Sequence, residues 1–426
     1  MAGACAGWED DADHQFRCRF REEPSENEFD DKSYCRFHLP MGELGEGGKA
    51  DWDDDQKNAI SDDIIARFGA EAKKPEDDRE ILNFSGALVP GIIRLSNVTI
   101  PWINFSGARF HRIADFREAW FLRHADFDGA QFHRGADFHG AEFHGRASFE
   151  GVRFHELADF EAARFDEEAY FVSARFHGWA NFAGSPDISQ AEARQFNELD
   201  YNGARFHDSA DFFNREFLAH TDFSSCVFEY APDFHGSSLH QDTEFGSIHC
   251  FPDVTGPGAE RAYRTLRLAM EGHRARAEEG MFFALEQKAR RHGMDRRDPA
   301  YWLSLAYEKG SDYGLSVLRP LLWFLGGIVA STFVLYAVGF YADGFPGGAG
   351  RHAMDLAAKA ADALNFSARQ AFLPFDALRS ADEVLDAYDF NPGGTGWLRA
   401  WGLLVTLFEG LAALLLILAV RWRYRR

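Results

Sequence analysis

Four residues near the start of the sequence are of types that commonly bind metal ions. Cys5, Cys18, Cys35 and His38 follow the pattern C-x12-C-x16-C-x2-H. Three thiolates and one imidazole suit tetrahedral zinc, and four protein ligands leave no open position for catalysis. The first two spacings are long, so the alternative is a set of free cytosolic thiols in an acidic arm. We predict a small structural zinc knuckle within residues 1–45.

A second set of titratable side chains recurs at a fixed interval. His111, His133, His155 and His177 each follow a Phe directly and are spaced by 22 residues. If 22 residues make one coil, these histidines stack on one outer face about 4.8 Å apart. Protonated neighbours would repel, so their pKa values should be lowered and coupled. The simple interpretation is a solvated repeat position; the alternative is that they sense acid or bind a metal ion and signal to the C-terminal hairpin.

Two charged residues lie within the last apolar run of the chain, Trp397 to Val420. Arg399 is near its start and Glu409 is in its middle. A carboxylate at the centre of a bilayer costs about 2.5–3.5 kcal/mol, so Glu409 should face protein or water. It would be either a protonated group hydrogen-bonded between subunits or a pore-lining, proton-sensing group.

No enzyme motif accompanies these residues. The sequence has no nucleophile elbow, phosphate-binding loop, H-E-x-x-H or glycine-rich dinucleotide turn, so we predict that the chain is not an enzyme. A net charge of −22 over 426 residues argues against nucleic acid as a partner, because phosphate binding needs a basic face.

The element that must position the histidines is a repeat of eleven residues. Phe recurs at alternating intervals of five and six, and an Ala stands two residues before most of them. Neither a helix nor an ordinary strand has this period. The clearest members of this Phe ladder are Phe116, Phe121, Phe127, Phe132, Phe138, Phe143, Phe149, Phe154, Phe160 and Phe165.

Four sides of 5, 6, 5 and 6 residues would make a square coil with Phe and Ala pointing inward. In the stretch "ADFDGAQF" the sequence resembles the pentapeptide-repeat family in its Phe-rich form. The resemblance implies a mainly β fold, a right-handed quadrilateral β-helix, over residues 82–247. About seven coils are expected. One residue is missing between Ile100 and Phe105, and we expect a surface loop after Phe182, with the ladder resuming at Tyr201.

The segments on either side of the ladder differ in character. Residues 46–81 form an acidic polar linker with a short helical stretch. Residues 257–316 show helical spacing and are predicted to form a helical hairpin before a juxtamembrane segment. We expect the hairpin to cap the open end of the β-helix, whose last coil would otherwise be a free sheet edge. The alternative is a groove for a partner.

Residues 317–426 are predicted to form a two-helix transmembrane hairpin. Arg319 to Ala342 and Trp397 to Val420 are long enough to cross a bilayer. Basic residues flank both outer ends, which places both termini in the cytoplasm and the hairpin in the inner membrane. Membrane-bound members of the pentapeptide-repeat family have a similar tail. The loop of residues 343–396 contains an amphipathic helix, which would lie on the outer membrane surface or form part of a two-span channel.

Three functions follow from this organisation. The first is a membrane-anchored scaffold whose cytoplasmic β-helix binds an unidentified protein partner. The second is a homo-oligomeric channel or sensor gated by the β-helix. The third is an acidic DNA mimic, which the resemblance suggests because some soluble family members inhibit topoisomerases in this way. Arg109, Arg153, Arg164 and Arg175 interrupt the acidic surface and weaken the third.

Overall fold

The computed structural model describes residues 27–29, 32–34, 37–39, 41–42, 48–75, 78–185, 195–342, 364 and 395–424. The chain divides into two compact units, Met1–His292 and Gly293–Arg426. The predicted amphipathic helix in the loop of residues 343–396 lies outside the described residues.

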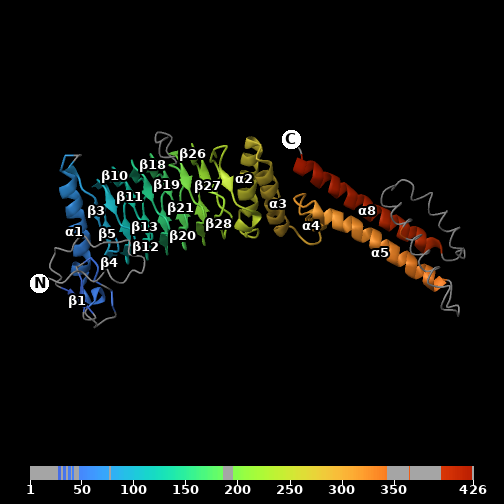
Figure 1. The fold of residues 1–426 in the computed structure, drawn as a ribbon, viewed down its shortest axis with the longest axis horizontal. Helices are drawn as coiled ribbons and strands as arrows, with labels where there is room; N and C mark the ends of the chain where they lie inside the picture. The colour runs from blue at the N-terminus through green and yellow to red at the C-terminus, as the bar shows by residue number, and fades with distance from the viewer. Residues whose placement is uncertain are drawn as a thin grey trace. The chain divides into compact units, whose positions relative to one another are not determined.

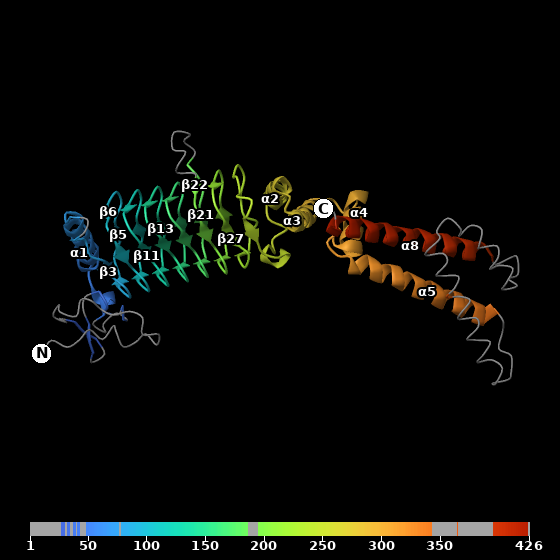
Figure 2. The same ribbon diagram turned by 45° about the horizontal axis from the view of Figure 1, so that its top comes forward.

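The first unit is built around a four-sided parallel β-solenoid, which confirms the predicted quadrilateral coil. Each side of a coil is a strand of two or three residues, and strands one coil apart pair in parallel to form four sheets. Figures 1 and 2 show these coils stacked between helix α1 at one end and helices α2 and α3 at the other. We call the sheets sides 1 to 4, in the order in which the chain reaches them.

The strands of the first two sides are as follows. Side 1 contains β3 (Leu82–Asn83), β7 (Ile103–Asn104), β11 (Ala125–Asp126), β15 (Ala147–Ser148), β19 (Ala169–Tyr170), β23 (Leu199–Asp200), β27 (Thr221–Phe223) and β29 (Glu244–Phe245). Side 2 contains β4 (Leu88–Val89), β8 (Arg109–Phe110), β12 (Gln131–Phe132), β16 (Arg153–Phe154), β20 (Arg175–Phe176), β24 (Arg205–Phe206) and β28 (Val227–Phe228).

The other two sides are shorter. Side 3 contains β5 (Ile93–Arg94), β9 (Ala114–Asp115), β13 (Ala136–Asp137), β17 (Ala158–Asp159), β21 (Ala180–Asn181) and β25 (Ala210–Asp211). Side 4 contains β6 (Thr99–Ile100), β10 (Trp120–Phe121), β14 (Glu142–Phe143), β18 (Arg164–Phe165), β22 (Gln195–Phe196) and β26 (Glu216–Phe217).

The eleven-residue period produces this structure because every second side carries one extra residue. Ala125 pairs with Ala147, so a regular coil spans 22 residues. The Phe rings point inward and stack on the rings one coil away. Phe138, for example, lies 4.7 Å from Phe116 and 4.8 Å from Phe160, with the ring planes within 3° of parallel. The Ala positions are buried between them, where a larger side chain would collide.

The ladder is interrupted after Phe182, but it resumes earlier than the sequence predicted. Phe196, rather than Tyr201, is the first inward residue, and it pairs with Phe165 across an interval of 31 residues. The prediction was wrong because Phe196 and Tyr201 are joined by a shortened corner. The corner between Phe196 and Tyr201 is one residue shorter than usual, as is the corner between Ile100 and Phe105.

An N-terminal cap covers the first coil. The sequence predicted a short helical stretch within an acidic linker here, but not its packing against the solenoid. Helix α1 (Asp54–Ala72) begins with a capping box, in which Asp53 Oδ1 accepts from the backbone N of Gln56 at 2.7 Å. Its buried residue Phe68 packs edge-on against Phe84 at 6.0 Å. Beside it, the buried Lys49 of the short 3₁₀ helix η2 (Lys49–Asp51) donates to the carbonyls of Phe37 and Leu88.

The predicted helical hairpin covers the last coil. Helices α2 (Ala259–His273) and α3 (Arg276–His292) follow the 3₁₀ helix η5 (Ile248–Cys250). Phe282 of α3 packs edge-on against Phe245 at 5.2 Å, which continues the hydrophobic core into the hairpin. The two helices are joined by the buried Glu286, whose carboxylate accepts from Arg264 at 2.9 Å and Arg267 at 2.7 Å. The free sheet edge is thereby closed.

Beyond the solenoid and its caps, the described residues include a short strand pair and three further helices. Strands β1 (Asn27–Phe29) and β2 (Lys32–Tyr34) form an antiparallel pair. The second unit contains α4 (Pro299–Ser311), α5 (Leu318–Ala342) and α8 (Thr395–Tyr424). In this unit α5 and α8 lie side by side, with Phe324, Ile328 and Ala412 buried between them.

The predicted transmembrane hairpin corresponds to α5 and α8. Side chains are described for residues 318–334 of α5 and for residues 404, 405 and 407–421 of α8. Among the residues that the structure describes, no helix combines the length and apolar character needed to cross a membrane.

Candidate functional site

The histidines predicted to stack on one outer face do so on side 2. Ring centroids are 4.7 Å apart for His111 and His133 and 5.0 Å apart for His133 and His155. The next step, to His177, is 5.4 Å. A fifth ring continues the stack, because His207 lies 4.6 Å from His177. The sequence analysis missed it because the insertion lengthens this interval from 22 to 30 residues.

The two ends of the histidine stack differ in polarity. At one end His207 Nδ1 lies 2.7 Å from Glu229 Oε1, and this carboxylate oxygen can accept a hydrogen bond from it. At the other, His111 Nε2 is buried and has no hydrogen-bond partner among the residues with described positions. Burial lowers the pKa of His111 to about 4, and His133, Lys49 and Arg109 add to the shift. Burial and neighbouring histidines also lower the pKa values of His133 and His177. Burial is the larger cause for all three residues, and the charge of neighbouring imidazoles adds to it. Coupled titration of the stack stays a prediction.

A row of arginines runs beside the histidine stack. In each coil the residue before the inward Phe of side 2 points outward, and four of these are exposed arginines: Arg109, Arg153, Arg175 and Arg205. The last three occupy successive coils and pair directly in register. None of the four forms an ion pair with another residue in the described part of the chain. We call the four arginines and five histidines the Arg–His face.

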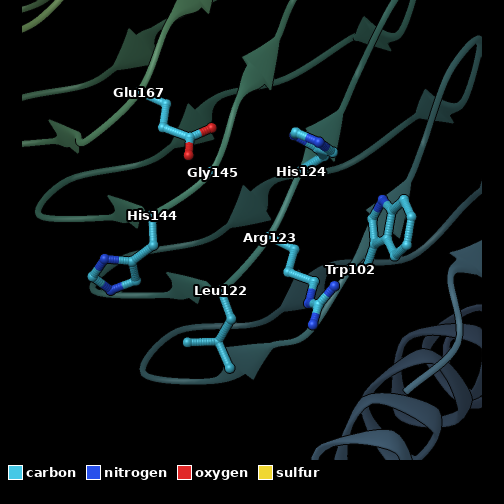
Figure 3. A pocket seen from close by; sticks show the side chains of 7 residues that line it. All are labelled: Trp102, Leu122, Arg123, His124, His144, Gly145 and Glu167. Carbon is cyan, nitrogen blue, oxygen red and sulfur yellow. The ribbon is translucent and has the colours of Figure 1, made fainter. Parts of the chain in front are cut away.

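A separate surface hollow of about 230 Å³ lies at the corner between sides 4 and 1. Figure 3 shows the side chains around it, contributed by successive coils. Its lining residues are Trp102, Leu122, Arg123, His124, His144, Gly145 and Glu167. Trp102 packs edge-on against His124 at 6.1 Å, and His144 Nδ1 lies 2.7 Å from Asp166 Oδ2. The volume is below the usual range of small-molecule and cofactor pockets.

Two local features of the sequence create the hollow. Only Pro101 and Trp102 form the corner after β6, whereas three residues form the same corner one coil later. A side chain is also absent at Gly145, where a Cβ atom would lie 2.8 Å from the carbonyl carbon of Arg123. The missing residue was visible in the sequence, but its consequence for the surface was not.

The remaining predicted site residues are placed as follows. Cys5, Cys18 and Cys35 lie outside the described residues, so the zinc knuckle stays a prediction. His38 is buried, with Nε2 2.9 Å from the Ser85 carbonyl.

The two charged residues of the last apolar run both belong to α8. Arg399 lies in its first turns, outside the described side chains. Glu409 is 1% exposed and lies against α5 near Gly327. It therefore faces protein, as the sequence analysis expected.

Comparison with known proteins agrees with the four-sided coil. Residues 95–142 and 138–186 match the family described as pentapeptide repeats in nine copies. The chain therefore contains a pentapeptide-repeat β-solenoid, and the resemblance seen in the sequence is confirmed for these residues. No curated protein and no solved structure matches the chain.

Proposed function

We propose that this protein is an interaction scaffold whose β-solenoid binds an acidic protein segment through the Arg–His face. The observation that carries the proposal is the row of exposed arginines on side 2, which form no ion pair with any residue that the structure describes. Like charges in register on neighbouring strands repel and destabilise a sheet. A row of this kind in a chain with a net charge of −22 is therefore better explained by a complementary partner than by stability.

The solenoid supports this function because it holds the row in a fixed geometry. Arg153, Arg175 and Arg205 project from paired strands, and the Phe beside each is buried and stacked. The core thus sets the backbone positions from which the arginine side chains project. Preorganised groups lose less entropy on binding, so a repeating carboxylate row on a partner would gain affinity from it.

Binding of a fluorescein-labelled oligoglutamate peptide to the full chain tests the proposal. We expect binding that weakens with salt and falls about tenfold in R153S/R175S/R205S, since three exposed ion pairs at about 0.2–1 kcal/mol each are lost. The matched control is R117S/R146S/R164S, which removes the same charge from arginines already engaged by Asp115, Tyr170 and Asp166. Equal loss in both variants, or no salt-dependent binding, would contradict the proposal. Tighter binding of single-stranded DNA would point to a nucleic-acid partner instead.

Membrane attachment is a second element of the proposal. One observation favours it: large apolar side chains point outward along α5 and α8, among them Val329, Phe333, Leu407 and Ile417, each more than 60% exposed. Exposed apolar surfaces of this kind mark membrane or protein contacts. The apolar runs of the sequence continue beyond the described side chains, so we propose that α5 and α8 anchor the scaffold in the inner membrane.

Flotation of the full chain with phospholipid vesicles tests the anchor. We expect the chain to float with the vesicles and V329E/L411E to remain in the dense fraction, because charges on the lipid-facing side oppose insertion. The control T265E/Q287E adds the same charge to the cap. Recovery of the wild-type chain in the dense fraction would contradict the anchor while leaving the Arg–His face untouched. Channel formation and homo-oligomerisation stay predictions.

A further inference from the structure

A mixed cluster of metal-binding side chains lies on side 3, away from the Arg–His face. His139 follows Phe138 in one coil, and Asp159 and Glu161 flank Phe160 in the next. All three side chains are partly buried. One ligand atom from each lies within 4.8 Å of the others, so a single ion could contact all three. The sequence analysis did not group them, because only the coil brings His139 beside Asp159.

Hydrogen bonds hold the two carboxylates of this cluster in place. Asp159 Oδ1 accepts from the backbone N of Glu161 at 2.9 Å and from Asn181 Nδ2 at 3.0 Å. The same amide nitrogen donates to Glu161 Oε2 at 3.2 Å. Asn181 is itself fixed, since it is 3% exposed and its Oδ1 accepts from the backbone N of Ala183. A ligand set supported by a buried partner is the arrangement that orients metal ligands.

The charge balance of side 3 changes at this cluster. In the coil before it, Arg117 pairs with Asp115 at 2.8 Å and reaches Asp137 at 3.5 Å. His139 occupies the position of Arg117 one coil later, and Glu161 occupies it in the coil after that. Burial raises the pKa of Asp159, and the nearby Asp137 and Glu161 raise it further while His139 opposes them. The Asp159 and Glu161 carboxylates thus lie together where the repeat no longer supplies an arginine.

We propose that His139, Asp159 and Glu161 bind a divalent first-row metal ion, with zinc as the first choice. Imidazole nitrogen and carboxylate oxygen are common zinc ligands, and they also suit manganese. The ion would neutralise the two carboxylates and link two successive coils. Three protein ligands leave a coordination position for water or for a partner's side chain. The inference is independent of the Arg–His face.

Calorimetric titration of the chelator-treated full chain with zinc chloride tests the site. The C5S/C18S/C35S background removes the predicted N-terminal ligands, so any remaining zinc binding must arise elsewhere. We expect roughly one zinc per chain and binding at least about tenfold weaker in H139Q, D159N and E161Q. The cysteine-free chain should also show a higher Tm with zinc, because a ligand that binds only the folded state stabilises it.

The structure supplies matched controls for folding and for charge. Asn181 occupies the repeat position of Asp159 one coil later, so D159N introduces a side chain that this position accepts. D211N removes a carboxylate from the equivalent position of β25, where Phe213 stands in the place of Glu161, and should leave zinc binding unchanged. Absence of zinc binding in the cysteine-free chain would overturn the proposal. Equal binding by wild type, H139Q and E161Q would do the same, with circular dichroism confirming that each variant is folded.

Discussion

The coils before Phe182 and the coils after it solve the same packing problem in different ways. Before it, the interior contains stacked Phe rings separated by Ala. On sides 2 and 4, the carbonyl at each small position accepts a hydrogen bond from a backbone N–H of the next coil. After it, Arg215 stands at a small position and is nevertheless fully buried. The difference shows how a repeat accommodates an insertion without losing its core.

The hydrogen bonds explain why an arginine belongs there. In the regular coils the carbonyl of the small residue accepts from the next coil, as Ala141 accepts from the backbone N of Arg164 at 2.9 Å. At the interruption, the Ala163 carbonyl accepts from Arg215 Nη1 at 3.0 Å instead. Arg215 also donates to the carbonyls of Phe182 and Phe160, and its guanidinium stacks 4.0 Å from the Phe196 ring. Burial lowers the pKa of Arg215 to about 9, which leaves it charged at neutral pH.

The largest expected effect is therefore at Arg215. Arg215→Ala should destabilise the protein by about 3–5 kcal/mol, because three backbone carbonyls each lose one hydrogen bond and a cavity replaces the side chain. Denaturant unfolding of the full chain measures it. Arg205→Ala, which removes an exposed arginine, should change stability by no more than about 0.5 kcal/mol. A similarly small change in stability for Arg215→Ala and Arg205→Ala would mean that water can replace the Arg215 side chain. The contrast between the coils before and after Phe182 would then be wrong.

The histidine stack gives the next largest effect. His111 stays neutral in the folded protein down to a pKa of about 4, whereas an unfolded histidine protonates near 6.5. The unfolded state therefore binds more protons below about pH 6.5, and stability falls as the pH is lowered toward 4. The loss from His111 should reach about 2 kcal/mol at pH 5. His111→Gln should flatten this part of the pH profile of Tm while leaving the difference between pH 7 and pH 8 unchanged. An unaltered acid profile in His111→Gln would contradict the lowered pKa.

A smaller effect compares two rings of the ladder. Phe138 stacks face to face on both sides, whereas Phe196 meets Phe165 and Phe217 at angles of 52° and 68°. Replacement by Leu keeps most of the buried area and removes the aromatic contacts. Phe138→Leu should cost about 0.5–1.5 kcal/mol more than Phe196→Leu, measured by denaturant unfolding. Equal costs would show that burial alone decides the loss of stability, because both rings are fully buried, and the reverse order would contradict the stacking argument.

The smallest expected loss of stability follows from removing an exposed ion pair on the regular coils. Arg134 pairs with Glu156 at 2.5 Å one coil away, but the two side chains are 60% and 47% exposed. Arg134→Ser should lower stability by about 0.5 kcal/mol or less, since exposed ion pairs are screened by water and salt. A loss above about 1 kcal/mol in thermal unfolding would show that cross-coil ion pairs stabilise the solenoid as much as its core does.

Much of the solenoid could be predicted from the sequence, and for a clear reason. The eleven-residue period of Phe and Ala allows only one register of inward residues, so the sides, the 22-residue coil and the shortened coil at Ile100 all follow from spacing. The stacking of His111, His133, His155 and His177 followed from the same 22-residue spacing. The inward position of Phe196, the stacking of His207 and the burial of Arg215 could not be predicted in this way. The insertion changes the spacing of the repeat, and the register after it depends on which strand pairs with the coil before.

The sequence by itself determined the four-sided coil, the order of its core rings and the outward position of His111 to His177, because a strict repeat converts spacing directly into geometry. Only the tertiary structure decided which residues meet across coils and at the ends. It placed α1 and Lys49 as a cap on the first coil, set Arg215 against the carbonyls freed by the insertion, and brought His139 beside Asp159 and Glu161. These contacts depend on the three-dimensional positions of groups far apart in the chain, and no local pattern records them.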